Sequence, residues 1–175
     1  MKKINLSICA TSLLFMLMSC VNLDLNPLSQ GSSENWYSSQ AEIEMSLNDF
    51  YRKEFFPIDD MTWGDDVSAR NTTSAVNNGT LTAEDGTIAS RWENYYKGIA
   101  RALRIINNMD RARSMGVSEK DISQYEGEAY FYLGYAYGML AFHWGDVILD
   151  KKGMSLDEAY SASRSPKADV LAYSY

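Results

Sequence analysis

The strongest constraint on the fold is the spacing of apolar residues after residue 90. They recur at intervals of four, three, four and three, at Trp92, Tyr96, Ile99, Leu103 and Ile106. This spacing places all five side chains on one face of an α-helix. The basic residues Lys97, Arg101 and Arg104 fall on the opposite face, which we expect to be solvated. The pattern predicts an amphipathic helix from about Ser90 to Ser114.

A second apolar stripe predicts a longer helix, with Ser118 as its N-cap and Gly145 as its C-cap after Trp144. Phe131, Tyr135 and Phe142 lie on the reverse side of this helix, so we expect it to be buried between neighbouring helices. Its main stripe consists of Ile122, Tyr125, Ala129, Leu133, Ala136 and Leu140.

Within this helix, Tyr130-x-x-Leu133-Gly134-x-x-Tyr137 matches the first half of the tetratricopeptide consensus, with Tyr in place of Trp. A glycine at position 134 would let another backbone approach closely. The second half of the repeat is missing, because Gly145 and the aspartate after it interrupt the chain where the second helix should begin.

Two further helices flank this pair. Ser39-Gln40-Ala41-Glu42 is a capping box, and apolar residues on one stripe extend the predicted helix to about Phe55, before Pro57. A last helix is expected near Pro166, with Ser165 as its cap and proline at the first helical position. The sequence stops at Tyr175 while this helix is still running, so we interpret the chain as an incomplete protein.

The N-terminus has the three regions of a bacterial export signal. Two lysines follow Met1, and the apolar stretch from Ile4 to Met18 is too short to span a bilayer as a stable helix. It ends in Leu17-Met18-Ser19-Cys20, which resembles the lipobox of bacterial lipoproteins. The only other cysteine, Cys9, would leave with the cleaved peptide.

These observations predict three parts. Residues 1–19 are a signal peptide, residues 20–36 are a lipidated N-terminus and tether, and residues 37–175 are a helical domain. Cys20 is the predicted lipid attachment site, which would hold the protein to a membrane surface. The formal net charge of −7 disfavours nucleic acid as a partner.

From Phe56 to about Ile88 no apolar period persists, and such a long irregular connection is usually functional or disordered. It brings together an aromatic ring, two carboxylates, a guanidinium and an amide. We expect these groups to bind a ligand, with the tryptophan as a stacking platform and the polar groups bonding hydroxyls. The alternative is that the tryptophan packs over the helix pair and the charges are solvated. The residues are Trp63, Asp65, Asp66, Arg70 and Asn71.

Three stretches together resemble the SusD/RagB family of outer-membrane nutrient-binding lipoproteins. They run from Cys20 to Pro27, from Trp92 to Asp110 and from Gly127 to Leu149. The last contains Trp144-Gly145-Asp146-Val147-Ile148-Leu149, where the family shows a G-D-V-P-L type turn and Ile148 takes the proline slot. The resemblance covers the N-terminal region of the family only.

The resemblance implies an all-α fold of tetratricopeptide-like helix pairs with long irregular loops, anchored by lipid to the outer face of the outer membrane. It also implies a protein that binds oligosaccharides or other nutrients and delivers them to a TonB-dependent, SusC-like transporter, without cleaving them. No cofactor or metal is expected.

Two other functions stay open at this stage. One is a structural helical-repeat lipoprotein that acts only by protein contacts. The other is a carboxylate-dependent glycoside hydrolase. A Cys/His nucleophile pair or a zinc cluster is disfavoured, because His143 is the only histidine and Cys20 the only cysteine expected in the mature chain.

Overall fold

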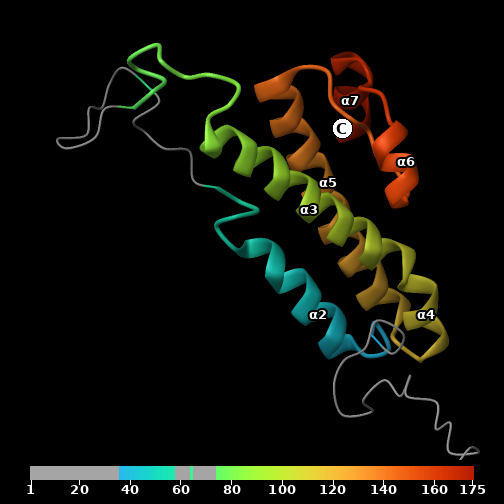
Figure 1. The fold of residues 1–175 in the computed structure, drawn as a ribbon. Helices are drawn as coiled ribbons and strands as arrows, with labels where there is room; N and C mark the ends of the chain where they lie inside the picture. The colour runs from blue at the N-terminus through green and yellow to red at the C-terminus, as the bar shows by residue number, and fades with distance from the viewer. Residues whose placement is uncertain (1–35, 58–63, 65–73) are drawn as a thin grey trace, which may run out of the picture. The chain divides into compact units, whose positions relative to one another are not determined.

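A computed structural model describes residues 36–57, 64 and 74–175, and all of these except Trp36 belong to one compact unit. The predicted signal peptide and nearly all of the tether lie outside the described residues. The described part contains no β-strand, only an isolated bridge between Val147 and Ser165. The prediction of an all-α fold is confirmed. The elements are α2 (Gln40–Asn48), the 3-10 helix η1 (Asp49–Tyr51), α3 (Gly86–Asn107), α4 (Met109–Ser114), α5 (Glu119–Trp144), α6 (Leu156–Ser161) and α7 (Lys167–Ser174) (Figure 1).

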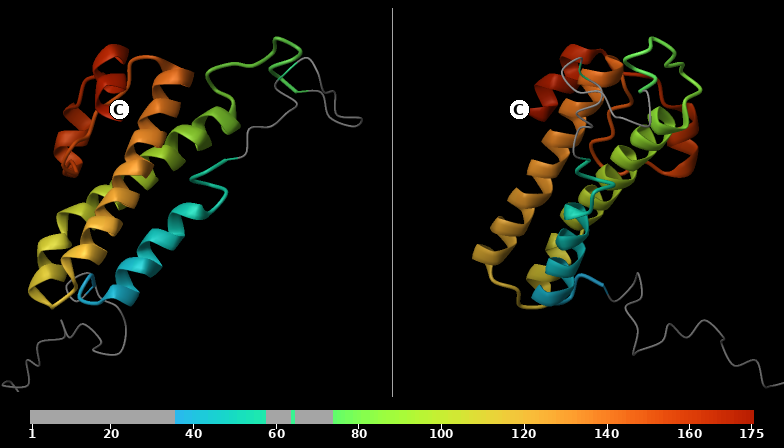
Figure 2. Two further views of the ribbon diagram at one scale, coloured as in Figure 1. Left: turned by 180° about the vertical axis from the view of Figure 1, so that it is seen from behind. Right: turned by 90° about the vertical axis from the view of Figure 1, so that its left-hand side faces the viewer.

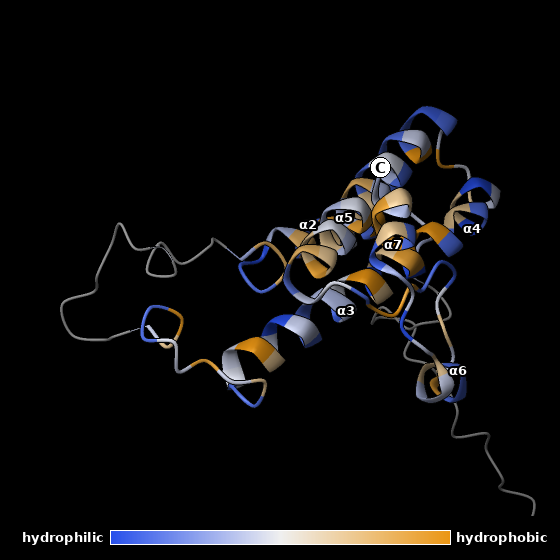
Figure 3. Ribbon diagram, turned by 90° about the horizontal axis from the view of Figure 1, so that it is seen from above, coloured by the Kyte–Doolittle hydropathy of each residue, from blue (hydrophilic) through white to orange (hydrophobic). Residues whose placement is uncertain are grey.

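The long helix α5 is the centre of the packing. It contacts α3, α2, α4 and α7, and the two views of Figure 2 show α3 running beside it. Its predicted ends are confirmed, because the Ser118 hydroxyl accepts the N–H of Asp121 and Gly145 adopts φ 74°. All six residues of its predicted main stripe are buried. Figure 3 shows apolar stretches on α5 and on α2 and α7, each of which contacts α5.

Aromatic rings fill the space between α5 and the segment that follows α2. Tyr132 stacks on Phe50 with ring centroids 4.6 Å apart, and Phe55 meets the same ring edge to face at 6.4 Å. On α3, a side chain at Gly98 would overlap the Tyr132 ring, so the absence of a Cβ lets α3 and α5 approach closely.

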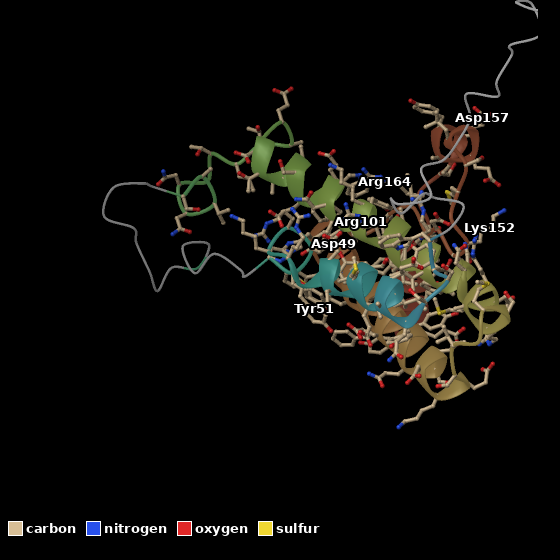
Figure 4. All side chains as sticks on the ribbon, turned by 90° about the horizontal axis from the view of Figure 1, so that it is seen from below. Asp49, Tyr51, Arg101, Lys152, Asp157 and Arg164 are labelled. Carbon is tan, nitrogen blue, oxygen red and sulfur yellow. The ribbon has the colours of Figure 1, made fainter. Side chains whose placement is uncertain are left out.

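The predicted basic face of α3 is exposed. Lys97 pairs with Glu93 one turn before it at 2.7 Å. Arg101 pairs with Asp49 at the start of η1, as Figure 4 shows, and its guanidinium also lies 4.7 Å from the centroid of the Phe55 ring. Exposed ion pairs of this kind contribute little to stability. The basic face of α3 is therefore a solvated face that contacts η1 through Arg101.

The predicted helix from Ser90 to Ser114 is wrong at its start and in its continuity. The helix begins four residues earlier, because the Asp85 carboxylate caps it by accepting the N–H of Thr87 at 2.8 Å. It ends at Asn107, since Asn108 leaves helical geometry with φ −106° and ψ 6°. The remaining residues form the separate helix α4.

The capping box that begins α2 is confirmed. The Ser39 hydroxyl accepts the N–H of Glu42, whose carboxylate in turn accepts the N–H groups of Ser38 and Ser39. The α-helix does not reach Phe55, however. It ends at Asn48 and gives way to one turn of 3-10 helix.

At the C-terminus the predicted cap is wrong. Ser165 does not cap α7, because its backbone pairs with Val147 in two hydrogen bonds of 2.8 and 3.3 Å. Instead the Asp146 carboxylate accepts the N–H of Lys167, the first helical residue, at 2.8 Å. Pro166 therefore precedes the helix and does not occupy its first position. The short helix α6, which begins with a capping box of Ser155 and Glu158, was not predicted.

The reverse side of α5 is also a correction. We expected it to be buried, but Phe131 is 64% exposed and Phe142 is 74% exposed. Tyr135 is half-buried under the ring of Phe56 at 4.5 Å, and the same ring stacks on Phe131 at a longer 6.4 Å. In the described part of the chain, this side of α5 is therefore not enclosed by neighbouring helices.

The predicted close approach at Gly134 is confirmed. A Cβ built there would lie 2.8 Å from the carbonyl oxygen of Ser174, near the end of α7. The helix whose backbone approaches α5 at Gly134 is thus α7. It follows α5 after a connection of about 20 residues. Among the described residues, no helix combines the length and apolarity required to cross a bilayer.

Candidate functional site

The residues predicted from sequence to bind lipid or ligand, namely Cys20, Trp63, Asp65, Asp66, Arg70 and Asn71, lie outside the described residues. Next to Trp63 the structure describes Gly64, whose carbonyl accepts a hydrogen bond of 3.0 Å from the Asn77 side chain. The site residues therefore stay predictions. A candidate site within the described part of the chain has to be built from other side chains.

Such a site lies where the start of α3 meets the end of α5. The rings of Trp92 and Trp144 pack edge to face there, with centroids 5.4 Å apart. Tyr96, one turn after Trp92, packs on that ring at 4.9 Å. Both tryptophans are partly exposed. We call the group formed by Trp92, Tyr96, Trp144 and Arg164 the tryptophan surface.

Arg164 brings a positive charge to this surface from the segment before α7. Its guanidinium lies 5.4 Å from the centroid of the Trp92 ring, within the range of a cation–π interaction. One of its nitrogens donates to the carbonyl oxygen of Asp146 at 3.4 Å. Among the described residues, no carboxylate forms an ion pair with it. Its remaining N–H groups are available to acceptors from solution.

Hydrogen bonds between side chains and the backbone hold the surface in place. The Tyr96 hydroxyl donates to the carbonyl oxygen of Ile148 at 2.8 Å. Burial raises the pKa of Tyr96 above its ordinary value, so the hydroxyl stays protonated and keeps donating. Asp146 fixes the start of α7 through Lys167. Three segments that are distant in sequence are thus joined at the tryptophan surface.

This arrangement suits the binding of a polar ligand that has flat apolar faces. Aromatic rings provide apolar area with little loss of conformational freedom, and a guanidinium donates several directed hydrogen bonds. His143 packs with Phe142 and Trp144, at 5.0 and 5.5 Å between ring centroids. In the part of the chain that the structure describes, no group of three or more His, Cys, Asp or Glu residues is arranged to hold a metal ion.

Sequence reasoning missed this surface. Trp92 was assigned to the core stripe of its helix and Trp144 to a helix end, while Arg164 was not singled out. One signal was present: the two tryptophans are equally far in sequence from Ser118, so an antiparallel helix pair turning there places them side by side. The position of Arg164 carries no comparable sequence signal.

Comparison with known proteins agrees with this architecture. A family profile described as starch-binding and associating with the outer membrane matches residues 23–172. The SusD-like protein P2 of Formosa agariphila is 25% identical over 172 residues, which is 90% of this chain and 34% of that protein. The crystal structure of a SusD-like protein from Bacteroides fragilis matches with a TM-score of 0.61 and 20% identity, over 86% of this chain and 30% of that chain.

The packing of α5 against α3 and α7 defines a helical-repeat class of protein, in which neighbouring helices build one continuous core. Within that class, the chain belongs to the SusD-like family, as its sequence predicted. It spans about one third of the length of the relatives that it matches.

Proposed function

We propose that this chain is part of an outer-membrane protein that binds glycans or other nutrients and passes them to a TonB-dependent transporter of the SusC type, without cleaving them. The observation that carries the proposal is the family match over residues 23–172, with its description as starch-binding and associating with the outer membrane. The export signal and the lipobox-like Cys20 support the membrane location.

Glycan binding is assigned first to the tryptophan surface. Trp92 and Trp144 present ring area next to the Arg164 guanidinium, a combination that stacks on a sugar ring and bonds its hydroxyls. The loop residues Trp63, Asp65, Asp66, Arg70 and Asn71 are proposed to supply further contacts to the same class of ligand. They combine the same chemical groups, a ring with directed polar groups.

Affinity electrophoresis of the full chain in gels that contain starch, or one of a panel of other polysaccharides, tests this assignment. Replacing Arg164 with Gln should weaken binding of the retarding polysaccharide about tenfold, which corresponds to about 1.4 kcal/mol for hydrogen bonds made by a charged donor. Trp92→Ala should weaken it at least as much. Tyr160→Ala is the control, since Tyr160 is 82% exposed on α6 and makes no ring contact with Trp92, Tyr96 or Trp144.

Unchanged retardation of the Arg164 and Trp92 variants, in a gel that retards the parent chain, would exclude the tryptophan surface as the binding site. A shortened polysaccharide recovered after incubation would contradict the proposal that the protein only binds. The loop is tested in the same gels with Trp63→Ala.

The lipid anchor needs its own test. Cells that express the chain are labelled with palmitate, and the Cys20→Ser variant is compared with the parent. We expect the variant to lose the label and to leave the membrane fraction. Co-purification of the lipidated protein with a TonB-dependent transporter tests the partner.

A further inference from the structure

The side chains of the tryptophan surface present hydrogen-bond donors to a ligand. Trp92 and Trp144 each carry an indole N–H, which can only donate. The guanidinium of Arg164 carries several N–H groups, and one of its nitrogens is directed at a backbone carbonyl oxygen. The hydroxyl of Tyr96 is already bonded to another backbone carbonyl. A ligand that fits this surface therefore has to supply acceptors.

Two carboxylates come close to this surface in the sequence, and both are bonded to other groups. The carbonyl of Asp146 accepts a nitrogen of Arg164, but its carboxylate accepts the N–H at the start of α7 at 2.8 Å. Glu93 of α3 pairs with Lys97 at 2.7 Å. Neither carboxylate forms an ion pair with Arg164, so its positive charge is left for a group from solution.

The fold holds this charge against the rings. The Arg164 guanidinium lies 5.4 Å from the centroid of the Trp92 ring, beside α3 (Figure 4). The next residue, Ser165, is fixed by its two backbone hydrogen bonds to Val147. Burial raises the pKa of Tyr96, and the charge of Arg164 acts in the opposite direction, as expected for a cation near that hydroxyl. The guanidinium is therefore preorganised at the edge of the aromatic group.

An anionic group on a sugar matches these donors better than a hydroxyl does. A hydroxyl both donates and accepts, so a surface made of donors leaves its hydrogen without a partner. A carboxylate or a sulfate ester only accepts, and a guanidinium can bind it through two parallel hydrogen bonds of the stronger, charge-assisted kind. The net charge of −7 repels polyanions from the chain as a whole, so their binding requires a local positive site.

We propose that the tryptophan surface recognises acidic sugars. Arg164 binds the carboxylate or sulfate ester, and the rings of Trp92 and Trp144 contact the apolar face of the same sugar or of its neighbour. This inference rests on the proposed function, because it takes the tryptophan surface as the glycan site. It narrows the ligand from glycans in general to glycans that carry an anionic group.

Affinity electrophoresis of the full chain with two matched pairs of polymers tests the proposal. One pair is polygalacturonate and its methyl ester, and the other is dextran sulfate and dextran, so each pair differs in its anionic group. We expect at least one acidic polymer to bind the chain about tenfold more tightly than its neutral counterpart. Its binding should weaken as salt is added, because salt screens exposed charges. The pair that responds distinguishes a carboxylate from a sulfate ester.

A charge-matched control separates this site from the overall charge of the chain. Arg164→Gln should weaken binding of the acidic polymer about tenfold. Lys120→Gln removes the same charge from an exposed position in the first turn of α5, at the opposite end of the helix from Trp144, and should leave binding unchanged.

Three results would overturn the inference and leave glycan binding itself intact. They are equal binding of the acidic and neutral polymers, equal loss in the two variants, and retardation by starch but by neither acidic polymer. A chain that none of these polymers, nor starch or the wider panel, retards would contradict the proposed function as well.

Discussion

Tyr137 of α5 and Asp150 of the following connection are joined by two hydrogen bonds through one hydroxyl group. The Tyr137 hydroxyl donates to the carbonyl oxygen of Asp150 at 2.7 Å and accepts the N–H of the same residue at 2.8 Å. Burial raises the pKa of Tyr137, so this hydroxyl stays protonated at any ordinary pH. This pairing ties the segment that follows α5 back onto α5 itself.

The first prediction concerns this pairing. Tyr137→Phe removes both hydrogen bonds and leaves a partly buried N–H and carbonyl of Asp150 without their protein partner. We expect the free energy of unfolding to fall by about 1–3 kcal/mol, the usual cost of unsatisfied buried polar groups. Urea unfolding measures it, with Tyr160→Phe as the exposed control. A loss no larger than that of the control would contradict this account of the connection.

The second prediction concerns Gly134. Gly134→Ala places a methyl group against the Ser174 carbonyl, so α7 has to move away from α5. We expect a loss of about 1–3 kcal/mol, as for other overpacked sites. Gly127→Ala is the matched control on the same helix, because nothing lies within 4 Å of its Cβ position. It should stabilise the chain by up to about 1 kcal/mol through helix propensity.

Thermal unfolding of both variants at low protein concentration separates the cost of overpacking at Gly134 from the gain in helix propensity that any Gly→Ala change brings. A Gly134 variant as stable as the Gly127 variant would show that α7 does not depend on this close approach.

The third prediction concerns the cap of α7. Asp146→Ala removes the acceptor of the Lys167 N–H, which should destabilise the first turn of α7 by about 1 kcal/mol. Asp146→Asn keeps an acceptor oxygen and should cost less. Hydrogen exchange of the first α7 amides measures both. Equal exchange in the alanine variant and the parent would mean that the turn is held by other contacts.

The fourth prediction is a pH effect on α6. The backbone N–H of Ser155, the Lys152 ammonium and the Ser155 hydroxyl lower the pKa of Glu158 from its ordinary 4.5 to about 2. A carboxylate with a lowered pKa stabilises the folded helix above the ordinary value, and this contribution is lost as the pH falls through the folded value. We expect α6 to fray progressively between about pH 4.5 and 2.

Amide exchange or NMR shifts of α6 follow this transition. Glu158→Gln should remove the pH dependence, since its side chain does not titrate in this range. A parent chain whose α6 does not change below pH 4 would contradict the assigned capping role.

The sequence predicts those features whose cause is local. The ends of α5 follow from Ser118 and Gly145, and the start of α2 follows from the Ser39 capping box, so both were found correctly. The main stripe of α5 also identifies its buried residues. In contrast, Asp85 and Ser155 begin helices by the same capping chemistry, yet they stand in polar stretches without an apolar period to draw attention to them.

Features that depend on distant partners could not be read in this way. The cap of α7 comes from Asp146, which is 21 residues before the N–H that it accepts. The exposure of Phe131 and Phe142 depends on which helices pack on α5. Apolar residues on both sides of a helix do not show which of the two sides a neighbouring helix covers. The same holds for Arg164 on the tryptophan surface, since its contact with Trp92 depends on the path of a long connection.

The backbone bridge between Val147 and Ser165 closes the connection between α5 and α7 at its two ends. The helix α6 lies inside this closed segment and has no buried residue. The helix pair therefore does not depend on α6 for its core. Residues around Ser161 form an exposed appendage to the helix core, so an epitope inserted there should be tolerated by the chain.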